Sequence, residues 1–120
     1  MSNPALIKTF TAGAAVDPAR IVTLSAASTV TAANSATAAS IGISDEIPQV
    51  ATGRNVDVIL SGVAWVTAGA AVALGAMLTS DATGRAVTSA SAGNRIIGLA
   101  LDAASAAGDR IRCYISQGVQ

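Results

Sequence analysis

The hexapeptide Thr-Ala-Gly-Ala-Ala-Val occurs twice in this chain, at residues 11–16 and again at residues 67–72. When the chain is slid along itself by this spacing of 56 residues, 17 of the 54 aligned pairs are identical, whereas composition alone predicts roughly six. The identical pairs run through both copies and include several glycines. The sequence therefore predicts an internal duplication, with repeat one at residues 11–64 and repeat two at residues 67–120, the two related by a pseudo-two-fold axis.

The two copies are expected to form a single domain, because a chain of 120 residues is too short for two independent cores. Its hydrophobic fraction is 52%, but 28 of these residues are alanine, and its aromatic residues are only Phe10, Trp65 and Tyr114. Burial of such small side chains gains little against the entropy cost of ordering the backbone. We therefore expect a protein that gains further stability by burying surface against partner molecules.

Strands are favoured over helices, since β-branched residues and glycines interrupt the alanine-rich sequence every few positions. Short strands at roughly 8 to 12 residue spacing, with turn residues between them, are typical of an all-β barrel or sandwich. One turn is well defined, because residues 80–85 place Asp81 near its start and Gly84 at its end, as a hairpin requires. The expected strands are residues 7–11, 21–24, 29–32, 40–43, 56–60, 63–67, 76–79, 85–88, 95–101 and 110–116.

Residues 1–10 precede both copies and are rich in large apolar side chains. They form either an arm that reaches a neighbouring molecule or a first strand packed on the chain's own barrel. Trp65 lies near the junction of the copies and serves either as core filler or as an interface anchor. The candidate residues for contact with a partner or another subunit are Asn3, Pro4, Leu6, Ile7, Phe10 and Trp65.

Catalytic and metal-binding chemistry has little support in the sequence. The chain has no histidine, which removes the usual base of nucleophile systems and the commonest metal ligand. Cys113 is the only cysteine, so neither an intramolecular disulfide nor a CxxC metal site can form. The one adjacent acid pair, Asp45 and Glu46, is interpreted as a solvated turn. We therefore expect no enzyme activity, no catalytic residues, no cofactor and no metal.

The charge pattern also excludes two kinds of partner. Seven basic residues balance seven acidic ones without a stretch of one sign, so there is no electrostatic footprint for nucleic acid. Residues 58–80 are uncharged and reach the length of a membrane span. The aligned positions of the first copy include Asp17 and Arg20, which argues against a span. The start of the chain also lacks the pattern of a secretory signal peptide.

The second copy resembles a known family. It reads Val-Thr-Ala-Gly-Ala-Ala-Val at residues 66–72, Gly-Ala-Met-Leu-Thr-Ser-Asp-Ala-Thr-Gly-Arg-Ala-Val at residues 75–87 and Ile-Ile-Gly-Leu-Ala-Leu-Asp-Ala-Ala-Ser-Ala-Ala-Gly-Asp-Arg-Ile at residues 96–111. These segments resemble the capsid decoration proteins of tailed bacteriophages, which are also called cement or head-stabilising proteins.

The resemblance implies an all-β structural protein of the virion, without catalytic residues, that binds the outer surface of the capsid and stabilises the shell. It implies the major capsid protein and further copies of the chain as partners, with a homotrimer expected and a dimer as the alternative. Nucleic acid and membranes are not expected partners, and synthesis takes place in the host cytoplasm. The alternative function is an adhesive or carbohydrate-binding β-module on the particle surface.

Overall fold

The computed structural model describes residues 3–45 and 49–119, and over these residues the chain is all-β, with nine strands and no helix. The predicted fold class is therefore confirmed. Ten strands were expected, and residues 56–60 and 63–67 turn out to be two parts of one long strand. The strands are β1 (Asn3–Ala12), β2 (Ile21–Ala26), β3 (Thr29–Ala32), β4 (Ser40–Ser44), β5 (Asn55–Thr67), β6 (Met77–Ser80), β7 (Ala86–Thr88), β8 (Arg95–Ala100) and β9 (Arg110–Val119).

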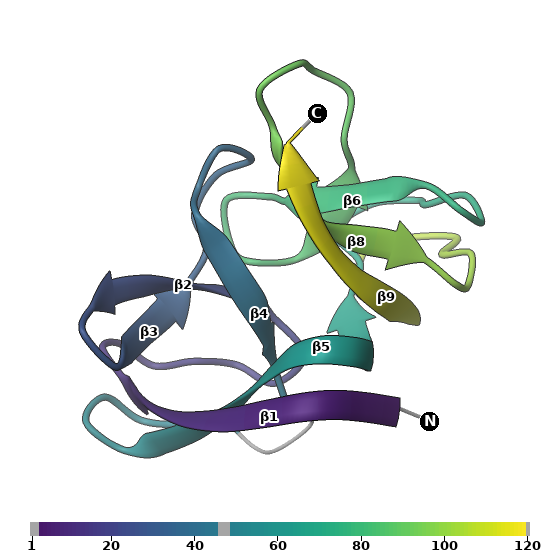
Figure 1. Cartoon of the computed structure of the whole chain (residues 1–120). Coiled ribbons are helices and arrows are strands. Elements are labelled where there is room, and N and C mark those ends of the chain that lie inside the picture. Colours follow the sequence, from purple (N-terminus) through teal and green to yellow (C-terminus); the bar gives the residue numbers. More distant parts are fainter. Residues whose placement is uncertain (1–2, 46–48, 120) are drawn as a thin grey trace.

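The first five strands close into a barrel. Each pairs with two neighbours in the order β1-β3-β2-β4-β5, and β5 returns to β1 in an antiparallel ladder. Figure 1 shows this barrel at the lower left, with β1 running alongside β5. Its interior is a cluster of buried side chains of modest size, which are Phe10, Ala12, Val16, Val22, Val30, Val50, Val56 and Val58.

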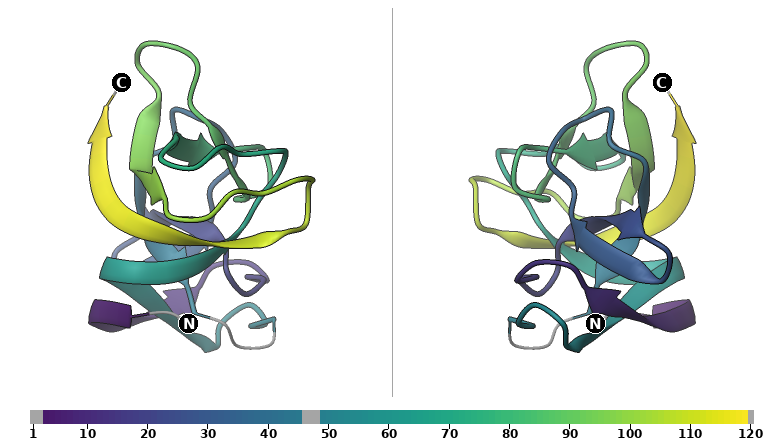
Figure 2. Two further views of the ribbon diagram at one scale, coloured as in Figure 1. Left: turned by 90° about the vertical axis from the view of Figure 1, so that its right-hand side faces the viewer. Right: turned by 90° about the vertical axis from the view of Figure 1, so that its left-hand side faces the viewer.

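The remaining strands form a second curved sheet that begins on the same strand β5. They follow in the order β9-β8-β6-β7, and a bridge between Ala68 and Ala86 brings the end of this sheet back towards β5. Figure 2 shows the curvature of this sheet from two sides. Gly62 lies where β5 passes from the first sheet to the second, with a φ of 92°. Only glycine adopts that conformation without strain, so this residue allows one strand to serve both halves.

The backbone hydrogen bonds of the two halves correspond. The N–H of Gly13 donates to the carbonyl oxygen of Val30, and 56 positions later the N–H of Gly69 donates to that of Ala86, both at 2.8 Å. In the last strands of the two halves, β5 and β9, corresponding residues are 55 rather than 56 positions apart. The further corresponding pairs, each written donor first, are Ala19–Ser44 with Gly75–Ala100, Ser44–Arg20 with Ala100–Ala76, Ala33–Ile21 with Ser89–Met77, and Asp45–Asp57 with Leu101–Arg112.

The two halves contact each other at several places, among them β4 against β8. Ile21, Ile43 and Ile59 lie outside the first barrel and are buried with the core residues of the second half. The carbonyl oxygen of Gly84, in the β6–β7 turn, accepts the N–H of Ile21 at 2.7 Å. A two-fold axis would pair Met77 with Ser28 as Ile21 is paired with Gly84, and no such hydrogen bond is present among the described residues, so the structure does not show the predicted pseudo-two-fold relation. The buried core forms two clusters. The cluster inside the first barrel contains residues of the first half alone, whereas the other contains Ile21, Ile43 and Ile59 together with residues of the second half.

The β6–β7 turn is shaped by Asp81. Its Oδ1 accepts the backbone N–H groups of Thr83 at 2.8 Å and Arg85 at 2.9 Å, and its Oδ2 accepts Nε of Arg85 at 3.0 Å. Burial raises the pKa of Asp81, but these hydrogen bonds outweigh it and hold the pKa below its ordinary value. Gly84 follows with a φ of 80°, as the predicted hairpin requires. The turn is thus held by its own hydrogen bonds where Gly84 meets the first barrel.

Candidate interaction surfaces

The described residues hold no group of three or more metal-ligating side chains and enclose no pocket. Burial raises the pKa of the Cys113 thiol to about 12, so this side chain is protonated at neutral pH and a poor nucleophile. Glu46, the second acid of the Asp45 pair, lies outside the described residues. In the ranges 3–45 and 49–119 there is no helix long and apolar enough to cross a membrane.

The outer edge of β1 is the first such surface. Asn3 is aligned with Val63 and Pro4 with Gly62, so the backbone of the strand follows β5 from its start. On its other side, β1 pairs with β3 through Thr11 and Ala12, and with no further strand of the described ranges 3–45 and 49–119. Over residues 3–10, among the strands that the structure describes, this edge is open.

The direction of the backbone groups at this edge follows from the ladder. The N–H of Thr11 donates to the carbonyl oxygen of Ser28 on the side away from β5. Alternate residues of an antiparallel strand point their backbone groups to the same side, so those of Ile7 and Thr9 face the open edge too. The side chains of Leu6 and Ile7 are 53% and 43% exposed. We call this surface, made by the backbone of residues 3–10 with Leu6 and Ile7, the β1 edge.

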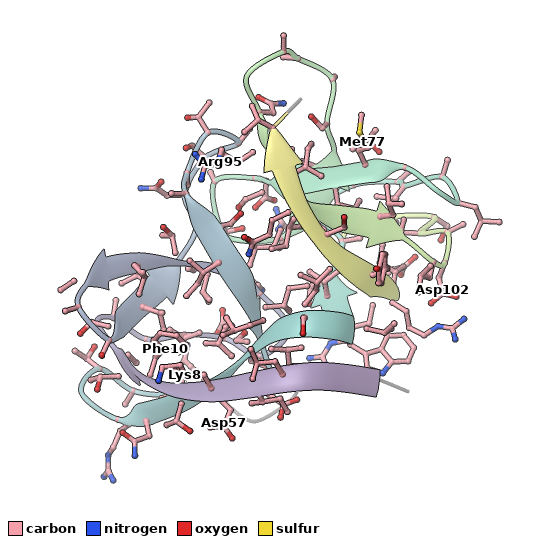
Figure 3. All side chains as sticks on the ribbon, viewed as in Figure 1. Lys8, Phe10, Asp57, Met77, Arg95 and Asp102 are labelled. Atoms are coloured by element: carbon pink, nitrogen blue, oxygen red, sulfur yellow. The ribbon has the colours of Figure 1, made fainter. Side chains whose placement is uncertain are left out.

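Phe10 and Trp65, the two aromatic residues among the six predicted contact residues, are less exposed than Leu6 and Ile7. Phe10 is buried in the first barrel, and Nζ of Lys8 lies 5.9 Å from the centre of its ring. Figure 3 shows Lys8 beside Phe10, with Asp57, which accepts the hydroxyl of Thr9 at 2.7 Å, nearby. Trp65 is half-buried on β5, aligned with Arg112. Of the six candidates, Leu6 and Ile7 are thus exposed, Phe10 belongs to the core, and Asn3 and Pro4 are placed by backbone pairing alone.

A second surface was missed by the sequence analysis. Met77 on β6 is aligned with Leu99 on β8, and Leu99 with Tyr114 on β9, so the three form a row across neighbouring strands. All three are substantially exposed, and so is Leu101, two residues after Leu99 in the chain. Figure 3 shows Met77 pointing away from β6. We call Met77, Leu99 and Tyr114 the apolar row.

One ion pair lies next to the apolar row. Asp102 Oδ2 accepts both the backbone N–H and Nε of Arg112 at 2.9 Å, while Oδ1 accepts its Nη2 at 2.8 Å. These hydrogen bonds, from the side chain first and then from the backbone, lower the pKa of Asp102 from 3.8 to about 2. The charges of Asp102 and Arg112 thereby neutralise each other beside the row.

The Asp102 pair predicts a pH dependence of stability. Since folding lowers this pKa, the carboxylate stabilises the protein above about pH 4, and its contribution disappears as the pH falls towards about 2. The Asp102→Asn variant should therefore unfold at lower urea concentration than the wild type at neutral pH, with the difference shrinking to zero in acid. Urea titrations of both proteins at a series of pH values measure this difference. A difference that persists unchanged in acid would contradict the assignment.

The family model described as phage cement protein matches residues 2–115. A sequence comparison with curated proteins gave no significant match. Among solved structures, the N base of head fiber gp8.5 in bacteriophage phi29 superposes with a TM-score of 0.68 at 20% sequence identity, over 92% of this chain and 93% of that chain. At that identity the likeness concerns the fold alone.

Proposed function

The chain belongs to the phage cement protein family, and on that premise we propose that it binds the outer surface of a phage capsid through the β1 edge and stabilises the shell. Its role is that of a capsid-associated structural protein, and its place is the virion. The partner is the major capsid protein. The chain acts as a homotrimer or a dimer, without enzyme activity and without nucleic acid, and is made in the host cytoplasm before it joins the shell.

The observation that carries this proposal is the open edge of β1. An unpaired strand edge presents backbone donors and acceptors that can pair with an extended segment of another protein. At the β1 edge, Ile7 and Thr9 point their backbone groups outwards, and Leu6 and Ile7 add exposed apolar side chains. A strand of the capsid protein added here would extend the sheet of the first barrel. Such a contact can be weak singly, since subunits linked to each other sum their contacts on a repeating shell.

Two substitutions at one position test the β1 edge. Ile7→Pro removes the outward N–H and leaves the inward hydrogen bonds to β5 intact, as proline permits on an edge strand. Ile7→Ser removes the apolar side chain but keeps the N–H. If a capsid strand pairs here, Ile7→Pro should weaken binding to expanded shells that lack this protein at least about tenfold more than Ile7→Ser does. Cosedimentation with purified shells measures the binding, and urea unfolding of each variant verifies the fold.

Two results would contradict the proposal. If the wild type does not cosediment with shells, and mass spectrometry finds no copies in purified particles, the function itself is wrong. If the wild type binds and folded Ile7→Pro binds equally well, the β1 edge is not the contact. A truncation of residues 2–9 is a poorer test, because it removes most of a strand of the first barrel.

A further inference from the structure

Lys8 is the one charged residue in the strand segment that forms the β1 edge, since residues 3–10 contain no other charged side chain. The side chain of Lys8 is exposed, and its Nζ lies over the ring of Phe10. Among the described residues, no carboxylate forms an ion pair with Lys8. The β1 edge therefore presents a positive charge that the chain itself does not compensate.

Asp57, the acidic residue of the neighbouring strand β5, is directed to the other face of the sheet. It is aligned with Thr9 and accepts the hydroxyl of Thr9 at 2.7 Å. Thr9 and Lys8 are adjacent in a regular stretch of β1, so their side chains point to opposite faces. Figure 3 shows Lys8 with Phe10 on one side of β1 and Asp57 on the other. Asp57 is thus not placed to pair with Lys8.

The neighbours of β1 limit where an added strand can pair regularly. From Thr11 onwards the edge is occupied by β3, and the N–H of Thr11 already donates to the carbonyl oxygen of Ser28 at 2.8 Å. Before residue 7 the register of β1 shifts twice, and Pro4 has no N–H to donate. The regular open part of the edge is therefore residues 7–10, and Lys8 lies within it.

The position of Lys8 in this stretch makes the residue opposite it important. Ile7 and Thr9 direct their backbone groups to the open edge, so an added strand forms its hydrogen bonds on either side of Lys8. Side chains directly opposite each other on neighbouring strands have Cβ atoms about 4.5 to 5.5 Å apart. At that distance opposite charges stabilise the pairing and like charges destabilise it. The side chain opposite Lys8 therefore decides which strands the β1 edge accepts.

We infer that Lys8 determines the specificity of the β1 edge, and that the capsid segment that pairs there carries an aspartate or glutamate opposite Lys8. The inference rests on the proposed function, which supplies the capsid protein as the partner. A second copy of the chain is disfavoured, because two β1 edges paired in register set one Lys8 against the other. A neutral segment is disfavoured as well, since it removes water from the ammonium group without compensating its charge.

Three substitutions test this inference by cosedimentation with expanded shells that lack the protein. Lys8→Glu should bind at least about fivefold more weakly than the wild type, since an attraction becomes a repulsion. Lys8→Arg keeps the charge and should bind within about twofold of the wild type. Arg95→Glu is the matched control, because it makes the same change in net charge at an exposed residue of β8, far from Lys8 (Figure 3). It should bind as the wild type does.

Salt dependence separates an effect of charge from an effect of packing. The difference in binding between the wild type and Lys8→Glu should shrink as the salt concentration is raised from about 0.05 to 0.5 M, because salt screens exposed charges. Urea unfolding of each variant verifies the fold. A loss of binding in folded Lys8→Glu that does not change with salt would show that Lys8 acts through its packing on Phe10, and would overturn the inference.

Further results would also overturn the inference. One is folded Lys8→Glu that binds shells as well as the wild type, and another is Arg95→Glu that weakens binding as much as Lys8→Glu does. A third is self-association of the free wild type, measured by sedimentation velocity, that Ile7→Pro abolishes, since the occupant of the edge is then a second copy. Each of these leaves shell binding by the wild type in place, whereas a wild type that does not bind shells refutes the proposed function itself.

Discussion

The Gly98→Ala variant is expected to lose about 3 kcal/mol of unfolding free energy, at the upper end of the usual cost of overpacking. A Cβ at this position would collide with the carbonyl oxygen of Tyr114 and approach Sγ of Cys113 at 2.9 Å. The carbonyl belongs to the β8–β9 ladder and cannot move without breaking strand pairing. The cost is purely steric, because the φ of Gly98 is not among the positive values.

Gly118→Ala is the matched control for this prediction. Gly118 lies in β9, aligned with Ile96, and a Cβ there meets no atom within 4 Å. Its substitution should change stability by less than about 0.5 kcal/mol, as at other unconstrained surface positions. Urea unfolding of both variants, followed by circular dichroism, measures the contrast. If Gly98→Ala and Gly118→Ala had equal free energies of unfolding, the space around Gly98 would be larger than the distances to Tyr114 and Cys113 indicate.

The Ile43→Ala variant is expected to lose about 2 to 5 kcal/mol, the range measured for large-to-small substitutions in cores. Ile43 is fully buried where the first barrel meets the second half, so its removal leaves a cavity between the two. Such a loss is a large fraction of the total stability of a small domain, which is about 5 to 15 kcal/mol. Because the halves share β5 and this interface, the chain should still unfold in one transition.

Leu74→Ala provides the control for Ile43→Ala, since Leu74 is the most exposed of the large apolar residues described. It should change stability by less than about 0.5 kcal/mol. All three proteins are compared at one concentration, because association raises the apparent stability. Two separate transitions in Ile43→Ala would show that the halves unfold independently, against the single domain predicted for residues 11–120.

Much of the secondary structure followed from local sequence. Asp81 and Gly84 predicted the β6–β7 hairpin correctly, because the chemistry of a tight turn depends on a few adjacent residues. The continuity of β5 was missed, since Ser61 and Gly62 read as a break between strands. The structure keeps them in the strand, where Gly62 has a positive φ as β5 passes from one sheet to the other.

The candidate surfaces were only partly accessible from the sequence. The apolar N-terminal segment pointed to β1, but it could not show that Phe10 faces the barrel while Leu6 and Ile7 stay exposed. Which side chains of an edge strand are buried depends on how the strand meets its neighbours, and those neighbours are distant in sequence. The apolar row was missed for the same reason, since β6, β8 and β9 come together only in the folded sheet.

The sequence by itself determined an all-β chain and several of the turns between its strands, because turn residues and β-branched residues act locally. The tertiary structure alone decided how β9 corresponds to β5. The sequence repeat aligns Ile59 with Ile115, whereas the backbone hydrogen bonds align Ile59 with Tyr114. Side chains alternate across a strand, so this difference of one residue decides which side chain faces the core. In the structure Ile115 is buried, whereas Tyr114 is exposed in the apolar row. Which of the two residues faces the core depends on packing between strands that are distant in the sequence.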